Sequence, residues 1–261
     1  MSTNFKYSYR PLDYDSLPID FTGNNKLGLY ATETTQRYVL GTRKLSWDGR
    51  VYKYCFSNNT CNPANGAMNN TAPFIADDGT NEVGNSNVVG DTFITADSQT
   101  VAEDLLAGGF VIIYSTYEQF RGIVGNTAGA GTEIRIYLDA PLTGTTTADT
   151  TDFCAYYSPY YGLANHANIS RTSVMCVPCT WVSAASMFFW GQTWGPCRIS
   201  PGAAGWGNAA GERQLVFGEN GSTFLHNADT GTTLQYQHAG FIIPLTASAD
   251  DAPLTMLQIS V

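Results

Sequence analysis

The chain has 261 residues, enough for one large β domain or two smaller ones, each with its own core. Only 13% of the residues are charged, about half the usual share. The net charge is −9, which would repel a phosphate backbone and excludes nucleic acid as the expected partner. The chain is rich in Thr, Asn, Gly and Ser and poor in the helix formers Lys, Glu and Leu, so the composition predicts an all-β protein.

Positive charge is concentrated near the N-terminus. Residues 1–53 carry eight basic and five acidic side chains, whereas residues 54–261 carry five basic and seventeen acidic ones. The basic part could dock on an acidic protein surface. The alternative is an uneven but solvated charge distribution with no partner.

The first residues lack the basic-then-apolar pattern of a signal peptide. No run reaches the roughly 18 apolar residues that a membrane helix needs. We therefore expect synthesis in the cytoplasm and no membrane partner. The six cysteines do not resemble a secreted disulfide framework in a chain of this length, and most are expected to be buried thiols.

Residues 1–35 are predicted to form an extended arm, ahead of a β-rich body at 36–261 that is expected to subdivide near 58–90. Prolines prevent regular pairing in the arm, yet its aromatic content is too high for a disordered linker. We expect the arm to pack its rings and basic groups on its own body or on a neighbour. Its candidate interface residues are Lys6, Tyr7, Tyr9, Arg10, Tyr14, Phe21 and Lys26.

The body is predicted to be an antiparallel sandwich or barrel with one short helix. Residues 36–57 favour a hairpin, because two apolar-rich runs flank Asp48-Gly49. The helix is expected at 98–107, where Val101, Leu105 and Leu106 form an apolar stripe that two glycines would end. Further strands are predicted at 91–95, 110–115, 119–126, 132–142, 214–217, 222–226, 233–237, 239–245 and 254–260.

The segment 187–197, MFFWGQTWGPC, is the most distinctive stretch of the chain. It lies within 26 residues, 172–197, that contain no Lys, Arg, Asp, Glu or His. Prolines and glycines interrupt this run too often for a membrane helix. The segment therefore predicts a buried core strand or a protein interface, and the alternative is that Trp190 and Trp194 form a sugar-binding platform.

Two functional interpretations remain open for the segment Cys176-Val177-Pro178-Cys179, a redox site and a zinc site. A thioredoxin-type redox site needs a strand–helix junction, whereas Thr180 and Trp181 favour a strand. A zinc site would need Cys55 and Cys61 as its second pair, whose spacing is loose. A buried disulfide or plain thiols is the preferred state.

No catalytic constellation is recognisable. The three histidines, at positions 166, 226 and 238, form no metal-binding motif, and the Gly-x-Ser-x-Gly nucleophile elbow is absent. The pairs Asp77-Asp78 and Asp250-Asp251 lie in loop-like sequence, and nothing selects two acids for glycoside hydrolysis. We therefore predict no catalytic residue, no metal and no cofactor, and we expect the protein not to be an enzyme.

The order of segments carries a resemblance to a known group of proteins. DTFIT (91–95), AGGFVII (107–113), QFRGI (119–123), IRIYLDAPL (134–142) and PYYG (159–162) are followed by FWGQTWGP (189–196). YVLGT (38–42) and DGRVYKY (48–54) precede them. This order resembles tailed-bacteriophage virion proteins encoded near the major capsid protein. Trp190, Gln192, Trp194 and Pro196 form the core signature of the resemblance.

The resemblance implies a decoration, or cement, protein on the outer surface of the phage head, which stabilises the shell. The implied partners are the major capsid protein and further copies of the chain, with a trimer expected by analogy. The implied location is the capsid surface of the virion. The alternative is a receptor- or glycan-binding tail or surface β protein, and a third option is an enzyme such as a glycosidase.

Overall fold

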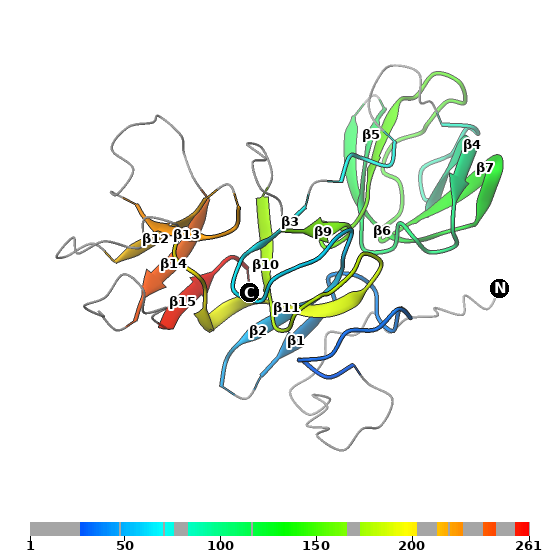
Figure 1. Cartoon of the computed structure of the whole chain (residues 1–261). Coiled ribbons are helices and arrows are strands. Elements are labelled where there is room, and N and C mark those ends of the chain that lie inside the picture. Colours follow the sequence, from blue (N-terminus) through cyan, green and yellow to red (C-terminus); the bar gives the residue numbers. More distant parts are fainter. Residues whose placement is uncertain are drawn as a thin grey trace. The chain divides into compact units, whose positions relative to one another are not determined.

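The computed structural model describes residues 27–46, 48–69, 71–75, 83–115, 117–165, 173–202, 213–218, 220–226, 237–243 and 254–260. These residues form fifteen strands and no helix, so the predicted all-β class is confirmed. The chain divides into two compact units (Figure 1). Unit 1 comprises Met1–Asn70 and Tyr160–Val261, and unit 2 is Thr71–Pro159.

Unit 1 is built on one ten-stranded antiparallel sheet with the order β13-β12-β14-β15-β11-β10-β3-β9, and β1 and β2 join it where β2 pairs with β11. The long strand β11 is central because it pairs with β2, β10 and β15. The strands are β1 (Arg43–Leu45), β2 (Val51–Phe56), β3 (Ala67–Asn69), β9 (Leu163–Ala164), β10 (Ser173–Pro178), β11 (Phe188–Arg198), β12 (Gln214–Phe217), β13 (Thr223–Leu225), β14 (His238–Ile242) and β15 (Leu254–Gln258).

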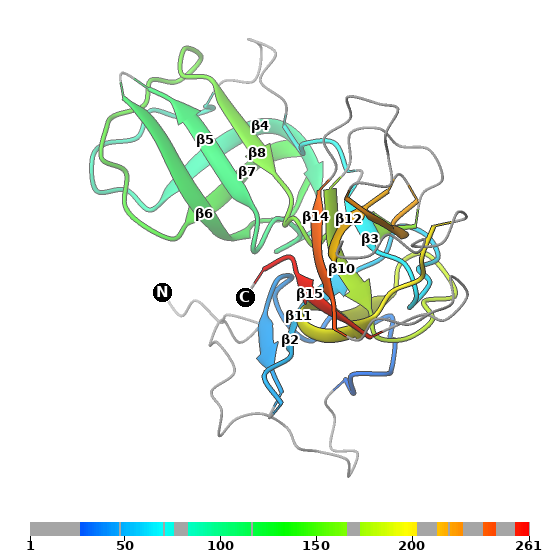
Figure 2. The ribbon, with the colours of Figure 1, turned by 90° about the vertical axis from the view of Figure 1, so that its left-hand side faces the viewer.

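Unit 2 is a five-stranded antiparallel sheet with the order β4-β7-β6-β5-β8. The sheet curls on itself (Figures 1 and 2). Single bridges line both edges, since Val83 pairs with Ala96 of β4 and Ile75 pairs with Ala155 of β8. The strands are β4 (Phe93–Val101), β5 (Phe110–Tyr114), β6 (Glu118–Asn126), β7 (Gly129–Leu138) and β8 (Phe153–Tyr156).

The alternation predicted in 132–142 is confirmed in β7. Ile134, Ile136 and Leu138 are buried in the core of unit 2. The intervening Arg135 is exposed and lies over the ring of Phe93. Because side chains alternate between the two faces of a strand, the period of two directs every second residue into the core.

The predicted hairpin is also confirmed. Leu45 is opposite Val51 in the register of β1 and β2, and Gly49 turns the chain with a φ of +83°. A glycine adopts this left-handed conformation without the steric cost of a side chain. The Ser46 N–H donates to the Arg50 carbonyl at 2.8 Å and closes the turn.

The predicted short helix is wrong. Residues 98–101 are the end of β4, and residues 103–108 form turns. Ser98 and Asp104 have φ values of +54° and +58°, which a right-handed helix does not allow. Val101 and Leu106 are both buried, but Val101 reaches the core from the end of β4 and Leu106 reaches it from the turn.

The predicted arm lies largely outside the described residues. This holds for residues 1–26, which contain all seven candidate interface residues, and for most of the strand predicted at 233–237. The described end of the arm belongs to unit 1, because Leu27 is buried and Glu33 forms a bridge with Phe188 of β11. Within the described residues, nothing forms a helix long and apolar enough to cross a membrane.

Candidate functional site

The core signature lies in β11, where Trp190 is among the largest fully buried side chains. Its indole N–H donates to the Leu27 carbonyl at 3.1 Å. The rings of Tyr38 and Tyr54 pack at 5.6 and 5.3 Å between centroids. The Lys44 ammonium lies 5.2 Å from the centre of the indole. A ring enclosed in this way has no face left for a ligand, so Trp190 is a packing residue.

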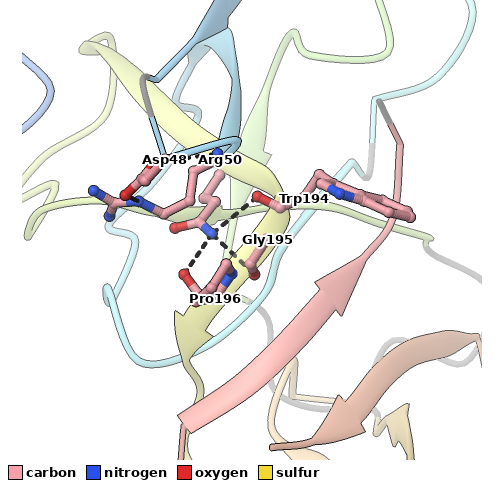
Figure 3. Close-up of polar contacts among 6 residues, drawn as sticks. Asp48, Arg50, Trp194, Gly195 and Pro196 are labelled. Carbon is pink, nitrogen blue, oxygen red and sulfur yellow. Dashed lines mark hydrogen bonds and ion pairs between the residues drawn. The ribbon is translucent and has the colours of Figure 1, made fainter.

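Gln192 holds the bend at the end of the signature. Its side-chain Nε2 lies 3.0, 3.2 and 2.8 Å from the carbonyl oxygens of Trp194, Gly195 and Pro196. These three carbonyls turn toward one point (Figure 3). Gly195 has a φ of +96°, and the register between β11 and β2 shifts between Gln192 and Trp194. The Gln192 amide therefore provides a hydrogen-bond donor for the carbonyls of a β-bulge, so its role is structural.

The remaining signature residues are more exposed. Trp194 is half-buried and Pro196 is exposed. Close to them, Arg50 forms an ion pair with Asp48 at 2.7 Å (Figure 3). Of the two proposed sugar-platform tryptophans, Trp190 is therefore enclosed and Trp194 offers only part of its surface. Trp181, which follows the CxxC segment, is 54% exposed.

The cysteines are free thiols, and five of the six are buried. Cys176 lies in the strand β10 and not at a helix N-terminus, so the arrangement that a thioredoxin-type site requires is absent from this segment. Burial raises the pKa of Cys176 well above its ordinary value and that of Cys61 to about 12. Both are therefore uncharged thiols at neutral pH, and a reaction that needs their thiolate form is slow there and faster at higher pH.

Zinc ligation by the two cysteine pairs is not supported by their positions. Cys55, Cys61 and Cys176 belong to one buried cluster, whereas Cys179 packs against the Trp190 cluster. Among the described residues, no group of three His, Cys, Asp or Glu side chains is placed to hold a metal ion. His226 and His238 are exposed, and His166 and the two aspartate pairs lie outside the described residues.

Unit 2 carries a surface that sequence reasoning missed. The cross-strand register places Phe110 opposite Gly122 and Tyr156, and Ile112 opposite Phe120. Side chains at paired positions point to the same face of a sheet. We call this surface the aromatic face, and it consists of Phe110, Ile112, Tyr114, Phe120 and Tyr156.

The aromatic face is open to solvent. Phe120 is 60% exposed, and Tyr114 and Tyr156 are 38% and 39% exposed. The rings of Phe110 and Phe120 stack at 5.3 Å with an angle of 12°. Phe110 and Ile112 alternate with Val111 and Ile113, which point into the core. An unbroken apolar run hides this two-sided arrangement from sequence inspection.

Acidic groups accompany the aromatic face. Glu118 pairs with Tyr114 in the register, and a Cβ atom at Gly122 would lie 2.8 Å from the Asp139 carboxylate. Unit 2 as a whole contains twelve acidic and two basic residues, out of 22 and 13 in the chain. Unit 1 therefore holds the other ten acidic and eleven basic residues. The acidity noted in the sequence is concentrated in the unit that bears the aromatic face.

Comparisons with known proteins identify no relative. No protein-family model matches the chain, and neither a curated protein nor a solved structure matches it.

Proposed function

We propose that this chain is a non-enzymatic virion protein that binds the outside of a tailed-phage head and stabilises the shell. The observation that carries the proposal is the exposed aromatic face of unit 2. Large exposed aromatic side chains are enriched in protein interfaces, where they contribute much of the binding energy. The order of segments described above supplies the viral context.

In this proposal the major capsid protein covers the aromatic face. Burying a large apolar side chain such as that of Phe120 contributes about 1.5–3 kcal/mol. The surrounding carboxylates of Glu118 and Asp139 favour a capsid surface with basic groups, because complementary charge speeds and orients docking. Association of the chain into a homo-oligomer, for which we propose a trimer, would multiply such contacts on one particle.

The test is reconstitution on phage heads that lack the protein. Wild type should bind in numbers comparable to the capsid subunit. Replacing Phe120 by Ser should reduce the apparent affinity about tenfold or more, which corresponds to roughly 1.4 kcal/mol. The matched control is Trp181→Ser, which changes an exposed aromatic residue of unit 1 and should bind as wild type does. Equal binding by all three proteins would rule out the aromatic face as the contact surface.

The N-terminal arm is a second proposed contact. A protein that lacks residues 1–26 should retain a folded body, because it keeps the buried Leu27 whose carbonyl accepts from Trp190. It should lose capsid binding, because the basic and aromatic side chains of the arm would make long-reach contacts. Wild-type occupancy by this truncated protein would contradict the arm's role. Failure of wild type itself to bind heads, together with binding to a glycan array that Phe120→Ser abolishes, would favour the receptor-binding alternative.

A further inference from the structure

Two buried thiols are in direct contact in unit 1. The Sγ atoms of Cys55 and Cys176 are 3.7 Å apart, and both residues are completely buried. Cys55 belongs to β2 and Cys176 to β10, and both strands pair with β11. The two cysteines therefore come from segments on either side of the central strand.

Gly191 of β11 makes this contact feasible. It pairs with Lys53 of β2 and with Pro178 of β10, between the two cysteines. A Cβ atom at position 191 would lie 2.2 Å from the Sγ of Cys176 and 3.3 Å from that of Cys55. Any larger residue would therefore occupy the space in which the two sulfur atoms meet.

A covalent link between these two cysteines would close a long loop of the chain. The two residues are 121 positions apart, and the whole of unit 2 lies between them. A bond between them would close a loop that holds the two segments of unit 1 together. Closing a long loop in the unfolded chain lowers its entropy and thereby stabilises the folded state.

We propose that Cys55 and Cys176 are an oxidisable dithiol, and that a small peroxide converts them into a disulfide that staples β2 to β10. Bond formation requires the sulfur atoms to approach from 3.7 Å to about 2.05 Å. In a reducing compartment the thiols persist, and in an oxidising environment the disulfide is favoured. The staple is thus added after folding, and the proposal does not depend on the function proposed above.

The chemistry has two steps. The thiolate of one cysteine attacks an oxygen atom of hydrogen peroxide, the O–O bond breaks, and a sulfenic acid and one water form. The sulfur of the second cysteine then attacks the sulfenic sulfur, and the hydroxide that leaves combines with the second thiol's proton as water. In sum, the two thiols lose two protons and two electrons, and the peroxide accepts them and is reduced to two waters.

The test uses the purified full-length protein and hydrogen peroxide. After treatment, free thiols are blocked, the unreduced protein is digested, and crosslinked peptides are identified by mass spectrometry. We expect one peptide pair that joins Cys55 to Cys176. Because the thiolate is the reactive form and burial raises the pKa of Cys176, the rate should increase about tenfold between pH 7 and pH 8.

The melting temperature provides a second readout. Oxidation should raise it by roughly 10 °C, and a reducing agent should reverse the increase. Cys55→Ala should abolish both the crosslink and the increase, whereas the control Cys154→Ala, which alters a buried thiol of unit 2, should retain both. A crosslink between Cys61 and Cys176, or no crosslink in the wild type, would overturn the proposal whether or not the variants fold.

Discussion

Gln192 is the residue whose side chain explains most about the signature segment. One amide nitrogen lies within hydrogen-bonding distance of three carbonyl oxygens, those of Trp194, Gly195 and Pro196. The bulge in β11 leaves these carbonyls turned inward, and a buried carbonyl without a donor costs about 1–3 kcal/mol. A glutamine can supply this donor without introducing a charge.

Replacing Gln192 by Glu should therefore lower the free energy of unfolding by about 3–5 kcal/mol at pH 8, because an uncompensated carboxylate would face three carbonyls. These oxygens raise the pKa of the introduced carboxyl in the folded state. The penalty is then full above that pKa and disappears below the unfolded-state value, so it should shrink by pH 4. Urea unfolding at both pH values measures the penalty. Gln192→Leu is the uncharged control, and an equal pH dependence in both variants would contradict the explanation.

Trp190 should be the more important tryptophan of the signature for stability. Trp190→Ala should cost about 3–5 kcal/mol, because it empties a fully enclosed site. Trp194→Ala, at a half-buried position, should cost clearly less. Equilibrium unfolding followed by circular dichroism measures both losses of stability. A larger loss for Trp194→Ala would contradict the assignment of Trp190 as the main packing residue of β11.

At the scale of elements, the turn at 102–108 depends on a residue from another strand. Asn126 of β6 accepts a hydrogen bond from the Leu106 N–H at 2.9 Å, and its Nδ2 donates to the Ala102 carbonyl at 2.9 Å. The apolar stripe that suggested a helix is thereby directed into the core by a turn. Local sequence favours either structure, and the distant amide selects the turn.

Asn126→Ala should destabilise unit 2 by about 1–3 kcal/mol, since it leaves the buried Leu106 N–H without its acceptor and removes the bonds to the part-buried carbonyls of Ala102 and Thr127. Asn85→Ala changes an exposed asparagine that bonds to Glu133, and its effect should stay within about 0.5 kcal/mol. Thermal unfolding of both variants gives the comparison. Similar stabilities would show that Asn126 does not hold the turn.

At the scale of the whole molecule, the sequence of unit 2 is an insertion in the sequence of unit 1. Asn69 pairs with Leu163 where the chain leaves and re-enters unit 1. Ile75 pairs with Ala155 just inside unit 2. Each unit has its own buried clusters, so each satisfies the basic requirement for independent folding.

Residues 71–159 expressed alone should therefore fold and unfold cooperatively. Unit 1 should also fold when a short Gly-Ser linker replaces unit 2, because Asn69 and Leu163 already lie side by side. Calorimetry of the two proteins tests both expectations. If either protein lacks a cooperative transition, the units are not independent.

Much of the secondary structure could be predicted from short-range patterns. The Asp48-Gly49 pair marks the hairpin turn, the alternation in 134–138 identifies the buried face of β7, and the uncharged run at 172–197 marks a central buried strand. The short strands at 67–69 and 163–164 could not be predicted, because two or three residues carry no periodicity.

The sequence by itself determined the β class, the positions of most strands and the buried face of β7, since each depends on neighbouring residues. Only the tertiary structure decided which distant segments meet. It brings Cys55 to Cys176 across Gly191, and it aligns Phe110 with Tyr156 and Ile112 with Phe120 on one exposed face. The physical reason is that strand pairing joins residues far apart in the chain, and a period of two does not specify the partner strand.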